Sequence, residues 1–126
     1  MPLPTYRAVI VGLTGIGGAR PAIDPALPIY HPKPASHAAA YHQHPRTELV
    51  GICDLRQEAL DSFRQRWQDA WPAMCYYTDF DRMLEEQKPD LVSIATSDHA
   101  HAGLTVAASH CGARAILCEK PIATTL

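Results

Sequence analysis

The sequence lacks any hydrophobic run long enough to cross a bilayer, which takes about 20 residues. Its first residues also lack the basic cluster and apolar stretch of a secretory signal. Charge of one sign is not in excess, since 11 Lys and Arg stand against 13 Asp and Glu, for a net charge of -2. Such a balance is atypical of proteins that bind nucleic acid or anionic membranes. We therefore expect a cytoplasmic protein that binds a small molecule, with no nucleic acid and no membrane among its partners.

The sequence lacks the closely spaced cysteine pairs that are typical of metal or redox motifs. The four cysteines, at positions 53, 75, 111 and 118, form no Cys-x-x-Cys pair. Cys53 and Cys118 lie in apolar runs, where a buried, reduced thiol is ordinary. The histidines, among them His99 and His101, form no closed set of ligands, so we expect no metal site. With 126 residues, 47% of them hydrophobic, the chain can build one domain with a core but not two.

Short apolar segments recur along the chain, each followed by an amphipathic one. The expected buried strands are 6–12, 48–53, 90–96 and 114–118, with a short one at 75–77. The first expected helix runs from His37 to about His44, with Ser36 as its cap, and the second follows Asp54 with Leu60, Phe63, Trp67 and Trp71 on one face. The third begins at a capping box of Thr78 and Asp81. The fourth runs along Ala100 to Cys111, with Gly112 as its C-cap. This alternation is typical of a doubly wound α/β fold, a parallel sheet of the Rossmann type covered on both faces.

One segment interrupts the alternation. Residues 18–34 contain prolines at 21, 25, 28, 32 and 34. Each proline removes a backbone donor and restricts the residue before it, so no regular element can run through this stretch. We expect a long loop inserted into the domain.

A glycine-rich turn follows the first expected strand. Gly12 and Gly17 occupy the first and third glycine positions of the Gly-x-Gly-x-x-Gly pattern, in which a dinucleotide's diphosphate approaches the backbone closely. Thr14 stands at the second position, where its Cβ would crowd the diphosphate unless Gly15 takes over that role. The alternative is a glycine-rich turn that binds no ligand.

Asp54 supports the dinucleotide interpretation by its spacing. In this fold an acidic residue about 20 positions after the glycine turn binds the adenosine ribose. Asp54 lies 37 positions after Gly17, and removing the 17 residues of segment 18–34 leaves 20. A carboxylate there would repel a 2′-phosphate, which favours NAD, although the nearby Arg56 leaves NADP possible. The alternative is that Asp54 and Gln57 form a capping box for the following helix.

These residues resemble the Gfo/Idh/MocA oxidoreductases, and the resemblance extends over nearly the whole chain. It rests on the turn 12–17, on segments 36–41, 49–54, 77–80 and 89–96, on His101, and on Cys118-Glu119-Lys120-Pro121. Glu-Lys-Pro directly after the last strand is the most specific of these features. The resemblance implies an NAD(P)-binding Rossmann domain that moves a hydride between nicotinamide and a sugar or cyclitol alcohol.

Site roles follow from the resemblance residue by residue. The turn residues Gly12, Thr14, Gly15, Ile16 and Gly17 and the carboxylate of Asp54 would bind the cofactor. Thr96 and His101 would line the nicotinamide side, Glu119 would contact the cofactor's ribose region, and Lys120 would be the catalytic lysine. An ammonium held beside a substrate hydroxyl can stabilise a developing alkoxide and assist proton transfer.

The family pattern extends beyond this chain. The resemblance implies a sixth strand, then a second α/β domain that supplies the substrate pocket, further catalytic residues and usually an oligomer interface. We therefore expect residues 1–126 to be a dinucleotide-binding domain truncated after its fifth strand, inactive alone and homo-oligomeric when full length. Two alternatives remain open here: a non-catalytic nucleotide-binding module, and a glycosidase that retains NAD on the same scaffold.

Overall fold

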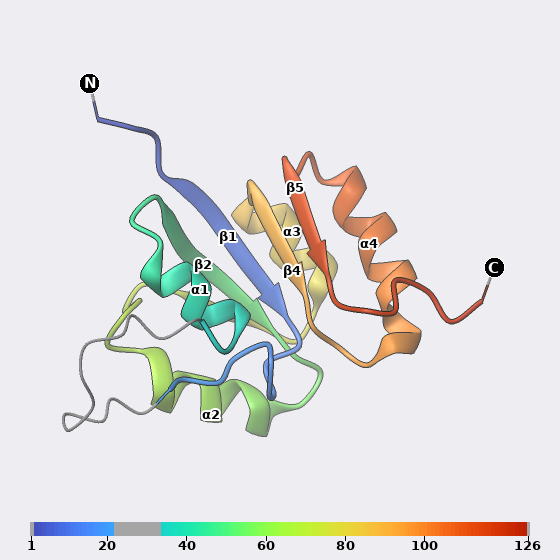
Figure 1. Ribbon diagram of the computed structural model, residues 1–126, viewed down its shortest axis with the longest axis horizontal. Helices are drawn as coiled ribbons and strands as arrows, with labels where there is room; N and C mark the ends of the chain where they lie inside the picture. The colour runs from blue at the N-terminus through green and yellow to red at the C-terminus, as the bar shows by residue number, and fades with distance from the viewer. Residues whose placement is uncertain (1, 22–33, 126) are drawn as a thin grey trace.

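The computed structural model describes residues 2–21 and 34–125 and contains one five-stranded sheet, all of whose strand pairs are parallel (Figure 1). The strands are β1 Tyr6–Val11, β2 Thr47–Cys53, β3 Cys75–Tyr77, β4 Leu91–Ile94 and β5 Ala115–Cys118. Their spatial order is β3-β2-β1-β4-β5. The central β1 therefore has β2 and β3 on one side and β4 and β5 on the other. This arrangement confirms the predicted doubly wound α/β fold of the Rossmann type.

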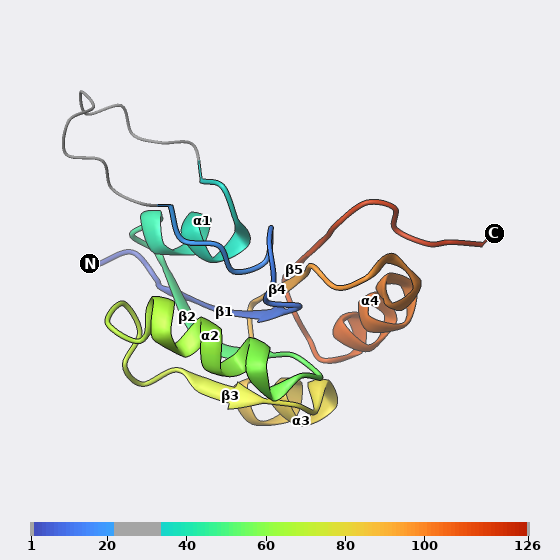
Figure 2. The same cartoon turned by 90° about the horizontal axis from the view of Figure 1, so that it is seen from below.

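Helices cover both faces of the sheet (Figure 2). Helices α1 (His37–Gln43) and α2 (Gln57–Trp67) pack on one face, and α3 (Phe80–Gln87) and α4 (His101–His110) on the other. A short 3-10 turn, η1 (Asp98–Ala100), leads into α4.

The sequence of β1 explains how one strand serves two cores. Successive side chains of a strand point to opposite faces. Ala8 and Ile10 therefore join the α1/α2 core with Phe63 and Trp67, whereas Val9 and Val11 join the α3/α4 core. All four β1 residues are buried, which accounts for an apolar run without alternation.

Two of the predicted helix boundaries differ from the structure. Helix α2 ends at Trp67, and Trp71 continues the apolar face from the turn beyond it, with its ring centroid 5.2 Å from that of Trp67. Helix α3 is capped by Asp79, whose carboxylate accepts the backbone N–H of Arg82 at 3.1 Å, and not by Thr78. The expected caps Ser36 and Gly112 are present, since Ser36 accepts the N–H of Ala39 and Gly112 follows α4 with φ +84°.

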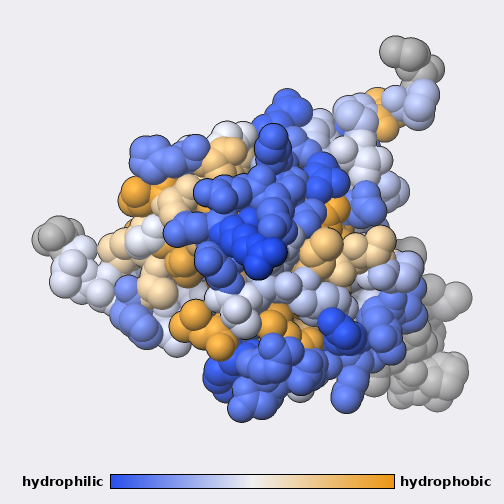
Figure 3. Space-filling model, turned by 180° about the vertical axis from the view of Figure 1, so that it is seen from behind, coloured by the Kyte–Doolittle hydropathy of each residue, from blue (hydrophilic) through white to orange (hydrophobic). Residues whose placement is uncertain are grey.

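The outer surface reflects the same layering. Hydrophilic side chains gather in the middle of the face shown in Figure 3, the side on which α3 lies. Strand β5 is at the sheet edge and alternates between exposed and half-buried residues, with Leu117 59% exposed. In the described ranges, no helix is long and apolar enough to cross a membrane.

The proline-rich segment predicted as a loop lies mostly outside the described residues. Its described residues, 18–21 and 34, contain no helix or strand. Residues 22–33 are not among those the structure describes.

Candidate functional site

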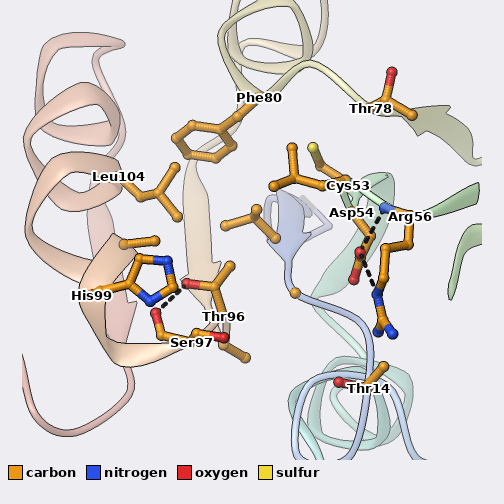
Figure 4. A pocket seen from close by; sticks show the side chains of 15 residues that line it. Thr14, Cys53, Asp54, Arg56, Thr78, Phe80, Thr96, Ser97, His99 and Leu104 are labelled. Carbon is orange, nitrogen blue, oxygen red and sulfur yellow. Dashed lines mark hydrogen bonds and ion pairs between the residues drawn. The ribbon is translucent and has the colours of Figure 1, made fainter.

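A pocket of about 640 Å³ opens at the carboxyl ends of the central strands (Figure 4). It is lined by the last residues of β1 and β2 and by the turns after β1, β2 and β4, with Phe80 and Leu104 on the side of α3 and α4. From β1 the chain builds β2 and β3 on one side and then crosses to β4 and β5 on the other, and ligands of open α/β sheets bind at such a switch point. The pocket's position alone makes it the candidate ligand site.

Two glycines of the turn are required by the protein's own packing. A Cβ on Gly12, which has φ +88°, would lie 2.5 Å from the carbonyl carbon and oxygen of Ala95 and 2.6 Å from the nitrogen of Thr96. A Cβ on Gly17 would overlap the carbonyl oxygen of Gly12. Both glycines therefore let the turn lie against the end of β4, whether or not a ligand is bound.

The tip of the turn, Thr14 to Ile16, is different. Its three residues are exposed, and Gly15 has φ +54° with no atom within 4 Å of a Cβ built on it. The next N–H groups fold back as one helical turn, Gly17 to Thr14 O at 3.1 Å and Ala19 to Gly15 O at 3.0 Å. Among the described residues, nothing accepts the N–H groups of Thr14, Gly15 and Ile16. Free N–H groups at the start of a helical turn suit an anion such as a diphosphate.

Helix α1 continues the helical turn despite the intervening segment. The N–H of His37 donates to Ile16 O at 2.8 Å, and that of Ala38 donates to Gly17 O at 3.1 Å. In an unbroken helix Ile16 O would bind the N–H of residue 20, so His37 stands 37 − 20 = 17 positions later than that donor. This count equals the 17 residues removed in the spacing argument for Asp54.

Asp54 ends β2 and faces the glycine turn. Its Oδ2 accepts the N–H of Leu13 at 3.2 Å, and its Oδ1 accepts the N–H of Arg56 at 3.0 Å. The Arg56 Nε lies 3.8 Å from Oδ1. Helix α2 has Arg56 as its N-cap residue, without a side-chain cap, and Gln57 bonds Asp61 instead, so the alternative capping box of Asp54 and Gln57 is absent. The carboxylate lines the pocket.

The end of β4 supplies the opposite wall. Thr96, Ser97 and His99 line the pocket, with the Thr96 hydroxyl donating to Ser97 O at 3.2 Å. His101 is only 1% exposed and is not among the residues that line this pocket, so its place on the nicotinamide side stays a prediction. Its Nδ1 is 2.6 Å from Pro121 O and its Nε2 is 2.9 Å from Thr96 O. His99, for which the sequence predicts no cofactor role, lines the pocket from the 3-10 turn η1.

Glu119 and Lys120 follow β5 at the same edge of the sheet. The backbone N–H of Glu119 donates to Ile94 O at 2.9 Å, which extends the β4–β5 pairing to the turn. Its carboxylate oxygen Oε1 lies 2.8 Å from Nε2 of His37, a contact between residues 82 positions apart that no sequence pattern predicts. The hydrogen bond from His37 is the main reason that the pKa of Glu119 is lowered from its ordinary value. Lys120 is exposed and lies outside the pocket lining.

Among the four cysteines, Cys53 is the one that lies at the pocket. All four are free, and Cys53 is buried at the pocket wall. Burial, with the nearby carboxylates of Asp54 and Asp79, raises the pKa of the Cys53 thiol to about 12. It is therefore a protonated packing residue at neutral pH. The described residues contain no group of three or more His, Cys, Asp or Glu that could hold a metal ion.

Several dehydrogenases resemble this chain in sequence. It is 34% identical to the D-apiose dehydrogenase of Paraburkholderia graminis over 91 aligned residues. The alignment covers 72% of this chain and 23% of that protein. It is 32% identical to the inositol 2-dehydrogenase of Salmonella typhimurium over 82 aligned residues. That alignment covers 62% of this chain and 22% of the relative. The chain thus spans about a quarter of the length of the curated relatives it matches.

Solved structures share the fold. The WlbA dehydrogenase from Bordetella pertussis, in complex with NADH and UDP-GlcNAcA, superposes with a TM-score of 0.69 at 27% identity, over 96% of this chain and 31% of that one. A putative myo-inositol dehydrogenase from Sinorhizobium meliloti superposes with a TM-score of 0.70 at 24% identity, over 94% and 29% of the two chains. Residues 34–126 match the family model described as "Oxidoreductase family, NAD-binding Rossmann fold". With that match over most of its length, the chain belongs to the Gfo/Idh/MocA oxidoreductase family.

Proposed function

We propose that this chain binds a nicotinamide dinucleotide for an oxidoreductase that acts on a sugar- or cyclitol-like alcohol. The observation that carries the proposal is the meeting of two features at one sheet edge. The free N–H groups of Thr14, Gly15 and Ile16 lie after β1, and the carboxylate of Asp54 lies after β2. The first suits a diphosphate and the second suits ribose hydroxyls. The names of the inositol, apiose and glucoside dehydrogenases support the class of substrate.

Three residues that line the pocket, Thr14, Asp54 and Thr96, and their neighbours along the sheet edge fit such a cofactor. The tip Thr14–Ile16 would hold the diphosphate, and Asp54 would accept hydrogen bonds from the adenosine ribose. Thr96 would face the nicotinamide side, and Glu119 would contact the ribose attached to it. The bound cofactor supplies a nicotinamide ring that exchanges a hydride with the substrate carbon.

Lys120 is the proposed catalytic residue. It follows β5 beside the fixed Glu119, at the edge where the pocket opens. Its ammonium would stabilise the alkoxide that develops on the substrate oxygen and would take part in moving the hydroxyl proton. Because the chain spans about a quarter of its relatives' length, we propose that further residues outside it complete the substrate pocket and that the isolated chain binds dinucleotide without turnover.

Asp54 favours NAD over NADP. The 2′-phosphate of NADP would lie beside the ribose hydroxyls and be repelled by a carboxylate. The guanidinium of Arg56, whose Nε is 3.8 Å from Oδ1, offsets part of that repulsion. We therefore propose NAD as the preferred cofactor, with weaker binding of NADP.

Calorimetric titration of the chain with NADH and NADPH tests the proposal. We expect saturable heat from NADH at micromolar concentrations and a weaker response to NADPH. A sample with the circular dichroism of an α/β fold that shows heat with neither dinucleotide would overturn the proposal.

A further inference from the structure

His37 is bound to both halves of the proposed dinucleotide site. Its backbone N–H donates to Ile16 O, at the tip where the diphosphate would bind, over 2.8 Å. Its ring Nε2 lies 2.8 Å from Oε1 of Glu119. Glu119 follows the edge strand β5, which is separated from β1 by β4. One residue therefore spans the distance between the glycine turn and the carboxylate proposed to contact the second ribose.

The ring of His37 has no other polar use among the described residues. Its side chain is only 4% exposed, and its Nδ1 is buried without a hydrogen-bond partner. Burying an imidazole costs free energy unless its polar atoms are bound. The contact with Glu119 is therefore the interaction that compensates for placing a histidine here, and it assigns Nε2 as the atom that carries the donated proton.

The Glu119 carboxylate can accept hydrogen bonds from a ligand while it is bound to the His37 ring. Its side chain is 29% exposed, so the carboxylate reaches solvent at the site. A carboxylate has about four lone-pair positions, and the His37 ring occupies one of them. Besides His37, the charged or titratable groups near it are Lys120 on the same turn and His101 from α4. The remaining positions suit the hydroxyls of a ribose.

We propose that His37 is a positioning residue, which holds the Glu119 carboxylate in the orientation that binds the nicotinamide-side ribose and couples that orientation to the diphosphate turn. The proposal rests on the function proposed above. It predicts that the ring of His37 matters for ligands with the second ribose and not for ligands that end at the diphosphate.

Three ligands separate these contributions in titrations of the full chain. NADH and ADP-ribose contain the second ribose, whereas ADP contains only the adenosine and the diphosphate. For His37→Ala we expect NADH and ADP-ribose to bind about tenfold more weakly, as for loss of a hydrogen bond to a charged group, with ADP affinity unchanged. His37→Gln retains an N–H donor and should recover most of the loss.

Tyr41→Phe is the matched control. Tyr41 lies on the same helix and its hydroxyl bonds the Ser93 hydroxyl at 2.6 Å, away from the turn. This variant should leave the ratio of NADH to ADP affinity unchanged. A thermal unfolding curve for each variant confirms that it is folded, and His37→Gln serves if His37→Ala is not.

The outcomes are distinct. Selective weakening of NADH and ADP-ribose, recovered in His37→Gln, supports the positioning role. Equal weakening of all three ligands, or no change in any, overturns it while leaving the dinucleotide site intact. If the unmodified chain binds neither NADH nor ADP, the proposed function is overturned, and the positioning role with it.

Discussion

The Asp54 carboxylate accepts the backbone N–H of Leu13 at 3.2 Å and so joins the end of β2 to the start of the glycine turn after β1. The same group accepts the N–H of Arg56 at 3.0 Å. Asp54 thus fixes the shape of the turn in the absence of a ligand and presents the charge proposed to choose between NAD and NADP. Its structural and recognition roles can be separated, because an amide retains the acceptor oxygen but not the charge.

Asp54→Asn should narrow the preference for NADH over NADPH by about tenfold, since removing the carboxylate removes its repulsion of a 2′-phosphate. Stability should change little, because the Asn oxygen can still accept from Leu13. Fluorescence titration with the two reduced cofactors measures the ratio. Asp61→Asn, on the exposed surface of α2, is the control and should leave the ratio unaltered. An unchanged ratio in Asp54→Asn would remove Asp54 from cofactor selection.

Gly12 and Gly15 should respond very differently to alanine. The Cβ of Gly12→Ala would meet the Ala95 backbone at 2.5 Å in a positive-φ conformation, so we expect a loss of about 2–4 kcal/mol in the free energy of unfolding. Gly15→Ala meets no atom within 4 Å and has only the cost of its φ of +54°, about 1 kcal/mol. Urea unfolding of both variants measures the difference. Equal losses would mean that the turn relaxes away from β4.

Much of the fold was predictable because local patterns determine it. The apolar run of β1 and the 3–4 spacing of Leu60, Phe63 and Trp67 on α2 have one physical solution, burial against a sheet. The cap of α3 was not predictable in this way. Thr78 and Asp79 are both good capping residues, and the choice of Asp79 depends on where β3 ends, which tertiary pairing decides.

The site was predictable in part for a related reason. The turn at Gly12 to Gly17 and the position of Asp54 follow from spacing along the chain. The pairing of His37 with Glu119 does not, because it depends on how α1 docks on the turn and on the register of β5. The contact of the His101 ring with Thr96 O likewise depends on how the chain folds between the two residues, which no periodicity encodes.

Lys120→Ala should reduce turnover by about 10²–10⁴-fold in the whole oxidoreductase, the usual contribution of a positioned proton-transfer group. Affinity for NADH should be unaffected, because the ammonium acts on the substrate oxygen. Steady-state rates with a polyol substrate and NADH titration together measure the two effects. Lys88→Gln removes the same charge at the end of α3 and should leave both unchanged. Full turnover in Lys120→Ala would exclude this lysine from the chemistry.

The hydrogen bond between Glu119 and His37 should be visible in the pH dependence of stability. The pKa of Glu119 in the folded chain lies below its ordinary value of 4.5, with the hydrogen bond from His37 as the main cause. A carboxylate whose pKa is depressed by folding stabilises the folded state fully above its unfolded pKa, and that contribution is lost as the pH falls through the folded pKa. The stability difference between the unmodified chain and Glu119→Gln should therefore shrink as the pH falls below about 4.5.

His37→Ala provides the matched background for this measurement. Without the imidazole, the main cause of the lowered pKa is gone, so Glu119→Gln should then produce a much smaller acid-dependent difference. Urea unfolding of the four chains, at several pH values between 3 and 7, closes the double-mutant cycle. A shrinkage below about pH 4.5 that is the same in both backgrounds would show that another group, and not His37, holds the Glu119 carboxylate in its ionised form.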